Sequence, residues 1–240
     1  LMLDYFSTTD PNDVIKGFPW HPHRGIETIT YILRGSVEHQ DSLGNKGVIG
    51  NGDVQWMTAG SGIIHQEMPS DFKDGIEGFQ LWLNLPSQDK MTEPKYGDIK
   101  ADMIKNIDDI NMSVKVIGGE YGGIKGPILR ENLKVKLLDI TLDAGSSYIH
   151  EVGEGINTFI FIYRGFGYFG SNRDRVNAKD AVLFEGTGGI RIESGDKLRF
   201  ILGEGIPLNE PVAWGGPIVM NTKEELRTAF AEYNNGTFIK

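Results

Sequence analysis

Short runs of β-branched, aliphatic and aromatic residues alternate with glycine-centred turns along most of this chain. The sequence contains 32 glycines, and many of them separate apolar stretches at intervals that suit strands and tight turns. In the first half the pattern predicts strands at residues 29–33, near 37, at 48–49, at 54–57 and at 79–83, with turns at Gly35, Gly44-Asn45, Gly52-Asp53 and Gly60-Ser61-Gly62. The pattern therefore predicts an all-β fold.

The C-terminal residues follow a helical pattern instead. Thr222 and Glu225 have the spacing of a capping box. Leu226, Phe230 and Tyr233 then recur at helical spacing until Gly236. We expect a short C-terminal helix that packs its apolar side on a β-domain.

The second half of the chain repeats the first. The stretch GIETITYILRG, starting at Gly25, aligns without gaps with GINTFIFIYRG, starting at Gly155. Further on, DVQWMTAGSGI from Asp53 aligns with DAVLFEGTGGI from Asp180, at a slightly shorter offset because the intervening turn is shorter in the second copy. Two copies of one β unit explain this similarity most economically.

Composition narrows the class of protein. A chain of 240 residues, 39% hydrophobic and 24% charged, fits a globular protein with one large or two ordinary β-domains. The net charge of −9 and the scattered basic residues argue against direct nucleic-acid binding. No apolar run is long enough to span a bilayer, and no secretion signal opens the chain. The absence of cysteine excludes thiolate chemistry and favours a cytoplasmic location. Because the first residue is Leu1, we expect native N-terminal residues upstream.

Two pairs of polar residues share one spacing. His21 and His23 are separated by a single residue, and so are His65 and Glu67. Residues i and i+2 of a strand point to the same face, so each pair can present two donors to one point. Imidazole nitrogens with one carboxylate suit non-haem iron or another divalent first-row metal, and zinc accepts them too. His39 and His150 lack a partner at this spacing, so we interpret them as structural.

The two copies of the repeat differ at the positions of the candidate metal ligands. In the alignment, His21 and His23 correspond to Glu151 and Gly153, while His65 and Glu67 correspond to Ile192 and Ser194. The second copy therefore lacks this set of donors. We expect one metal ion per chain, bound in the first copy.

Four stretches resemble the pirin family, a branch of the cupin superfamily, over essentially the whole chain. They are GFPWHPHRGIETITYILRG, the DSLGN turn, GDVQWMTAGSGIIHQEMP and PLNEPVAWGGPIVMNTKEEL. The resemblance implies a bicupin of two antiparallel jelly-roll β-barrels packed together. It also implies a mononuclear iron, most naturally Fe(II), held by His21, His23, His65 and Glu67. We expect a metal-binding N-terminal cupin at residues 1–85, a crossover at 86–112, and a C-terminal cupin with a degenerate site and the C-terminal helix at 113–240.

A second carboxylate competes for the fourth ligand position. The wider cupin pattern takes its carboxylate from four residues after the second histidine, where Glu27 stands. Strand parity would also allow Glu27 to face inward. We prefer Glu67 because its segment matches the pirin form, and we retain Glu27 as a supporting residue or alternative ligand.

The resemblance suggests two functions. One is an iron-dependent dioxygenase of the quercetin 2,3-dioxygenase type, which combines a flavonol with O₂ and uses Glu67 as ligand and catalytic base. Phe18, Trp20, Trp56 and Met57 are candidates for lining its substrate pocket. The alternative is a non-catalytic iron protein whose redox state controls binding to a protein partner. Both functions require the same four ligands, so the sequence does not separate them.

Overall fold

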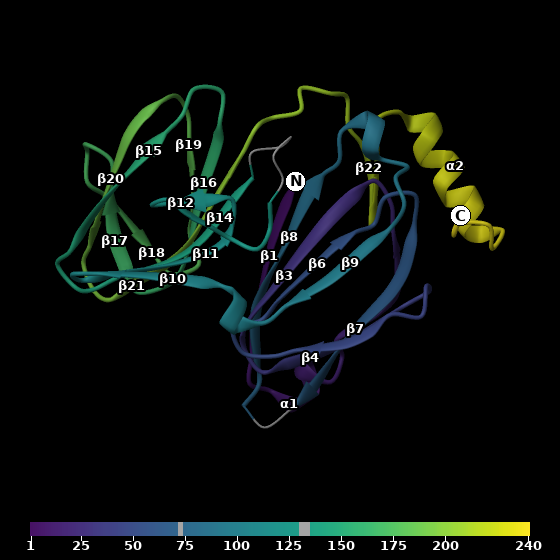
Figure 1. Ribbon diagram of the computed structural model, residues 1–240, viewed down its shortest axis with the longest axis horizontal. Coiled ribbons are helices and arrows are strands. Elements are labelled where there is room, and N and C mark those ends of the chain that lie inside the picture. Colours follow the sequence, from purple (N-terminus) through teal and green to yellow (C-terminus); the bar gives the residue numbers. More distant parts are fainter. Residues whose placement is uncertain (72–73, 130–134) are drawn as a thin grey trace. The chain divides into compact units, whose positions relative to one another are not determined.

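The computed structural model describes residues 1–71, 74–129 and 135–240. Strands dominate these residues, which confirms the all-β prediction (Figure 1). The chain forms two compact units: unit 1 contains residues 1–101 and 208–240, and unit 2 contains residues 102–207. Among the described residues, no helix combines the length and apolar character needed to cross a bilayer.

Unit 1 is built from two antiparallel sheets. The five-stranded sheet has the order β1-β8-β3-β6-β9, with bounds Met2–Thr8, Ile76–Asn84, Ile26–Arg34, Val54–Thr58 and Lys95–Ile99. The four-stranded sheet has the order β2-β7-β4-β5, with bounds Phe18–His23, Ile63–Asp71, Ser36–Asp41 and Lys46–Ile49. A short helix, α1 (Pro11–Val14), joins β1 to β2. The described strands form two separate antiparallel sheets, the double-sheet arrangement of the expected jelly roll.

The two sheets of unit 1 bury a shared apolar layer. Ile26, Met57 and Trp82 of the five-stranded sheet pack with Ile63 of β7. Since side chains alternate between the faces of a strand, the face of β3 that bears Ile26 also bears Thr28 and Thr30. This face looks toward β7, the strand that carries His65 and Glu67.

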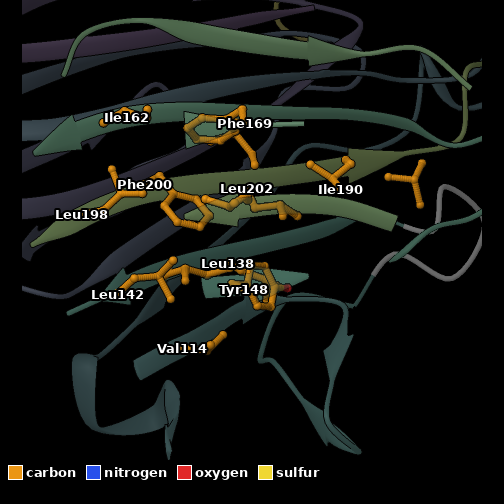
Figure 2. Packing of buried hydrophobic residues seen from close by; sticks show 14 of the residues in the cluster. Val114, Leu138, Leu142, Tyr148, Ile162, Phe169, Ile190, Leu198, Phe200 and Leu202 are labelled. Carbon is orange, nitrogen blue, oxygen red and sulfur yellow. The ribbon is translucent and has the colours of Figure 1, made fainter. Parts of the chain in front are cut away.

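Unit 2 also contains two larger antiparallel sheets. The six-stranded sheet has the order β10-β11-β14-β21-β16-β19, with bounds Lys105–Asp109, Met112–Gly118, Lys136–Leu142, Leu198–Gly205, Asn157–Arg164 and Ala181–Phe184. The four-stranded sheet has the order β15-β20-β17-β18, with bounds Ser147–Val152, Gly188–Ser194, Phe166–Phe169 and Asp174–Asn177. A small ribbon joins β12 (Glu120–Tyr121) and β13 (Ile124–Lys125). Aliphatic and aromatic side chains from both larger sheets fill the core of the unit (Figure 2).

The internal repeat is confirmed by strand pairing. β3 pairs with β8 and β6, and β16 pairs with β21 and β19 in the same antiparallel arrangement. Both long strands shift register at equivalent places, between Ile32 and Arg34 in β3 and between Ile162 and Arg164 in β16. These positions are the ones that the sequence alignment pairs, and equivalent β-bulges are a specific mark of duplication.

The expected crossover at residues 86–112 is partly strand. It contains two short 3₁₀ helices, Ser87–Asp89 and Ala101–Met103, as well as β9 and β10. β9 pairs with β6 in unit 1, whereas β10 pairs with β11 in unit 2. The boundary between the units therefore falls within the expected crossover, near residue 101.

By its contacts the C-terminal segment, residues 208–240, groups with unit 1, although it follows the second cupin in the sequence. It contains β22 (Ala213–Gly215), β23 (Ile218–Met220) and helix α2 (Lys223–Asn234). The predicted capping box is present, with Thr222 and Glu225 bonding each other's backbone N–H groups. The buried Arg24 guanidinium explains the placement, because it donates to Glu232 and to the carbonyl of Phe238.

Candidate metal centre

Strands β2 and β7 bring three histidines together. The antiparallel register places His21 opposite His65, and His23 opposite Ile63. One ligand nitrogen from each of His21, His23 and His65 lies within 4.8 Å of the other two. His23 and His65 are buried, with exposed fractions of 1% and 2%. The structure thus brings together the three histidines that the sequence singled out.

Backbone carbonyls orient two of the imidazole rings. His21 Nδ1–H donates to the carbonyl of Pro19 at 2.7 Å, and His23 Nδ1–H donates to that of Pro217 at 3.1 Å. The Nε2 atoms of His21 and His23 lie 3.0 Å apart, and in the Nδ1–H tautomer that the two carbonyls select, Nε2 is the atom that carries the lone pair. The buried Nε2 of His65 has no hydrogen-bond partner in the described part of the chain. Three convergent imidazole nitrogens, two of them in rings oriented by backbone carbonyls, fit a bound cation.

Burial keeps these imidazoles in the form that binds metals. It lowers the pKa of His23 well below the ordinary value, with a further contribution from the neighbouring histidines. Burial, followed by the proximity of His21 and His39, lowers the pKa of His65 to about 3. Both rings are therefore neutral at pH 7, as a metal ligand requires.

These pKa shifts predict an acid-sensitive metal-free protein. Below about pH 6.5 the unfolded chain protonates His23 and His65 while the folded chain does not, so stability falls as the pH falls. Each histidine should contribute a slope of up to about 1.4 kcal/mol per pH unit, and the contribution of His65 should end near pH 3. All four tryptophans lie in unit 1, so urea unfolding followed by tryptophan fluorescence reports on this unit. His65→Gln should reduce the slope by one histidine's share, whereas an unchanged slope would contradict the assignment.

Glu67 lies in the interior of unit 1 but outside the cluster of ligand nitrogens. Its carboxylate accepts a hydrogen bond from Gln80 Nε2 at 2.7 Å and another from Thr30 Oγ1 at 3.1 Å. Burial raises the pKa of Glu67, although these two hydrogen bonds and the charge of His21 act in the opposite direction. Gln80 was missed by the sequence reasoning, yet a glutamine inside the apolar run of β8 was a usable signal.

Glu27 does not face the histidines, although strand parity allowed it to. The register of β3 on β6 places Glu27 opposite Thr58, on the face opposite to that of Thr28 and Thr30. The Glu27 carboxylate accepts from Thr58 Oγ1 at 2.8 Å and from Trp56 Nε1 at 3.3 Å. Glu27 is buried but lies on the side of the sheet that turns away from the histidines.

The four candidate pocket residues fall in different places. Trp56 lies with Glu27 on the far side of the sheet, whereas Met57 is part of the apolar layer beside the histidines. Phe18 is half-buried against Phe6, with ring centroids 6.0 Å apart. Trp20, next to His21, is 48% exposed. Of the predicted pocket residues, Met57 therefore lies near the histidines and Trp56 lies on the other side of the sheet.

Two tryptophans that the sequence reasoning did not single out lie next to the cluster. The ring of Trp82 is 5.0 Å from that of His23, at an interplanar angle of 85°. Trp214 follows at 6.2 Å from Trp82. Trp82 also donates its Nε1–H to Gln80 Oε1 at 2.9 Å, which links it to the residue that holds Glu67.

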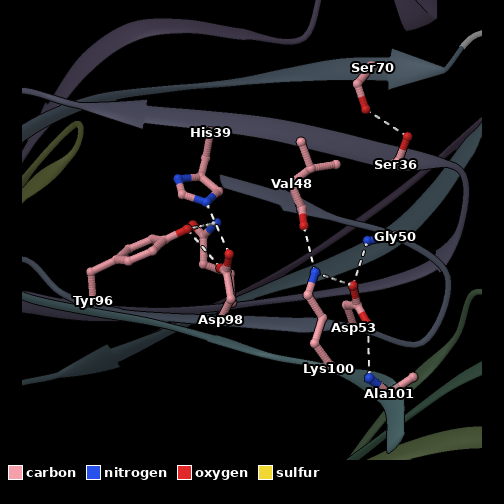
Figure 3. Close-up of polar contacts among 11 residues, drawn as sticks. Ser36, His39, Val48, Gly50, Asp53, Ser70, Tyr96, Asp98, Lys100 and Ala101 are labelled. Atoms are coloured by element: carbon pink, nitrogen blue, oxygen red, sulfur yellow. Dashed lines mark hydrogen bonds and ion pairs between the residues drawn. The ribbon is translucent and has the colours of Figure 1, made fainter. Parts of the chain in front are cut away.

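His39 stays outside the histidine cluster. It projects from β4 toward β9, where its ring lies 4.4 Å from that of Tyr96 and its Nε2 lies 3.5 Å from an oxygen of Asp98 (Figure 3). Tyr96 donates its hydroxyl proton to Asp98 at 2.7 Å. Burial lowers the pKa of His39, although the nearby carboxylates oppose this shift.

The equivalent position in unit 2 holds a different set of hydrogen-bonded polar residues. The pairing of β15 with β20 places Tyr148 opposite Ile192 and His150 opposite Ile190. Ile192 and Ile190 correspond to His65 and Ile63, so the counterparts of His21 and His23 are Tyr148 and His150, not Glu151 and Gly153 as the sequence alignment predicts. The shorter offset, which relates Asp53 to Asp180, therefore applies to this strand as well.

Both ring nitrogens of His150 are occupied. Nδ1 lies 2.9 Å from the hydroxyl of Tyr148, and Nε2 lies 2.6 Å from the carboxylate of Glu204. Burial raises the pKa of Tyr148, so the phenol keeps its proton. Glu204 also pairs with Lys136 at 2.7 Å. Because both ring nitrogens of His150 already have partners on opposite sides, Tyr148, His150 and Glu204 offer no converging set of nitrogens like that of unit 1.

Comparison with known proteins agrees with this architecture. The Pirin family profile matches residues 1–83, and the profile of the Pirin C-terminal cupin domain matches residues 137–239. A pirin-like protein of Solanum lycopersicum is 44% identical over 98% of this chain and 80% of its own length. A pirin-like protein of Caulobacter vibrioides is 40% identical over 99% of this chain and 86% of its own length.

A solved structure extends the similarity to three dimensions. The crystal structure of a quercetin 2,3-dioxygenase from Acinetobacter baumannii superposes with a TM-score of 0.89 at 38% identity, covering 99% of this chain and 85% of that protein. The profiles, the relatives and the duplicated two-sheet units agree with one another. The chain belongs to the pirin family, with a bicupin fold.

Proposed function

We propose that this protein is a non-haem iron dioxygenase that acts on flavonols, of the quercetin 2,3-dioxygenase type, with O₂ as co-substrate. The observation that carries the proposal is the convergence of ligand nitrogens from three buried or half-buried histidines, two of which donate Nδ1–H to backbone carbonyls. The similarity to the A. baumannii quercetin 2,3-dioxygenase supports the substrate class.

The donor set suits iron. His21, His23 and His65 would hold Fe(II) through nitrogen, and Glu67 would supply one anionic oxygen. Other divalent first-row metals fit the same donors. When bound, the metal supplies the Lewis-acid and redox chemistry that the reaction of a flavonol with O₂ requires.

The chain itself orients these groups and handles a proton. The carbonyls of Pro19 and Pro217 fix two of the imidazole rings, and Gln80 and Thr30 fix the Glu67 carboxylate. Burial makes Glu67 a stronger base than a solvated carboxylate. In the proposed reaction Glu67 accepts the proton of the flavonol 3-hydroxyl.

A reconstitution experiment tests this function. Metal-free protein is loaded with Fe(II) under argon, mixed with a flavonol such as quercetin, and then exposed to O₂. We expect loss of the flavonol spectrum together with release of carbon monoxide. Iron-replete protein that leaves the flavonol intact would contradict the proposal and favour a redox-responsive protein that binds a partner.

Two isosteric substitutions test the carboxylate assignment. Glu67→Gln should weaken iron binding by more than the roughly 10- to 100-fold that loss of an outer supporting group costs, because it removes the anionic ligand. It should also abolish flavonol turnover. Glu27→Gln is the matched control, because Glu27 is equally buried, at 3% exposed against 2% for Glu67, but lies on the other face of the sheet. Iron titration measures both effects. Loss of the metal in Glu27→Gln with retention in Glu67→Gln would make Glu27 the carboxylate ligand in place of Glu67.

A further inference from the structure

The ribbon of β22 and β23 contacts the histidine cluster. The carbonyl of Pro217, in the turn of this ribbon, accepts the Nδ1–H of His23 across 194 residues of sequence. The backbone of β23 follows the β2–β3 turn closely, because the N–H of Val219 donates to the carbonyl of Arg24 at 3.1 Å. A Cβ at Gly25, where φ is 76°, would lie 2.0 Å from the carbonyl oxygen of Val219. The ribbon therefore packs directly against the end of β2, the strand that carries His21 and His23.

This ribbon carries an exposed tryptophan in line with the site. Trp214, on β22, is 45% exposed. Its indole contacts Trp82 at a centroid distance of 6.2 Å and an interplanar angle of 40°, and Trp82 in turn contacts His23. Trp82 is only 8% exposed, so the row of rings runs from the buried imidazole to an accessible indole.

The indole of Trp214 is held in place. Its Nε1–H donates to the carbonyl of Gly216 at 2.8 Å, which fixes the ring against its own turn. Helix α2 supports the strand beneath it, because a Cβ at Gly215 would lie 3.1 Å from side-chain atoms of Leu226 and Phe230. An ordered, exposed aromatic face costs little further entropy when a flat ligand stacks on it.

We propose that Trp214 is a substrate-recognition residue, on which one ring of a planar aromatic substrate stacks while its hydroxyl-bearing end lies toward His23. This inference rests on the proposed function, which supplies the substrate class. It adds that the C-terminal segment selects for extended aromatic substrates. Small metal-binding molecules without a second ring system gain nothing from Trp214.

Paired ligands and variants test this assignment by binding, without turnover. The dissociation constants of quercetin and of a single-ring 3-hydroxypyran-4-one are measured spectroscopically for the iron-loaded protein under argon. Trp214→Ala should weaken quercetin binding about 10-fold, a loss typical of an aromatic stacking contact, and leave the pyranone unchanged. Trp214→Phe should keep most of the affinity for quercetin. The iron content should remain that of the wild type, since the Pro217 carbonyl is retained.

Tyr233→Ala, which removes another partly exposed aromatic residue of the C-terminal segment, is the control and should leave both affinities unchanged. Equal losses for quercetin and the pyranone in Trp214→Ala, or no loss for either, would overturn the recognition role. If wild-type protein binds quercetin but does not consume it under O₂, the proposed dioxygenase function is contradicted, while the recognition role of Trp214 still stands. Wild-type protein that binds no flavonol would overturn both.

Discussion

His65→Ala should reduce the metal content of the reconstituted protein from one ion per chain to nearly none. His65 faces His21 across the β2–β7 ladder, and its buried Nε2 has no hydrogen-bond partner among the described residues. Alanine therefore removes one of three convergent nitrogens without breaking a hydrogen bond of that atom. Flavonol turnover should disappear with the metal. Elemental analysis after removal of unbound iron measures this loss directly.

The matched control for His65→Ala is His150→Ala in unit 2. His150 is also buried, at 4% exposed, but both of its ring nitrogens face Tyr148 and Glu204. Its replacement should destabilise unit 2 and leave one metal ion per chain. Retention of the metal by His65→Ala, or its loss in a folded His150→Ala variant, would contradict the assignment.

Arg24→Met should destabilise unit 1 by about 2–6 kcal/mol, because two backbone carbonyls in a buried setting would each lose the donor that offsets their burial. The Arg24 side chain is 2% exposed. Its guanidinium donates to the carbonyls of Ser61 and Phe238 at 2.7 and 2.8 Å, pairs with Glu232 at 2.6 Å, and lies 4.2 Å from the centre of the Phe238 ring. Methionine fills similar space but leaves these acceptors without their donor.

Urea unfolding followed by tryptophan fluorescence measures this effect in unit 1. Arg227→Met is the control, because the Arg227 side chain is 74% exposed and pairs with Glu224, which is itself exposed. The control should change the stability by no more than about 0.5 kcal/mol. An Arg24→Met variant within about 1 kcal/mol of the wild type would show that the C-terminal segment is held mainly by other contacts.

Local patterns predicted much of the fold and the histidine cluster. Strand parity and the i, i+2 spacing of His21 and His23 are short-range properties, so they survive in the structure. The capping box at Thr222 is also local, and the duplication indicated by the alignment is seen in the paired bulges of β3 and β16. Parity alone did not decide which face of β3 looks toward β7, and this is why Glu27 was misplaced.

Long-range contacts were beyond the sequence. Nothing near Pro217 or Trp214 in the chain indicates a partner in the N-terminal strands, yet Pro217 orients His23 and Trp214 extends the row of rings. The alignment of the repeats also failed locally at β15, because the flanking turn has no fixed length in the two copies. Tyr148 and His150 were found as counterparts only through their ladder partners.

X-ray diffraction from iron-loaded crystals, recorded above and below the iron absorption edge, tests the central claim most directly. One anomalous peak per chain, among His21, His23 and His65 and within bonding distance of Glu67, is the result predicted here. A peak beside His150 and Glu204, or a peak at the histidines with Glu67 still bound only to Gln80 and Thr30, would contradict the proposed four-ligand centre.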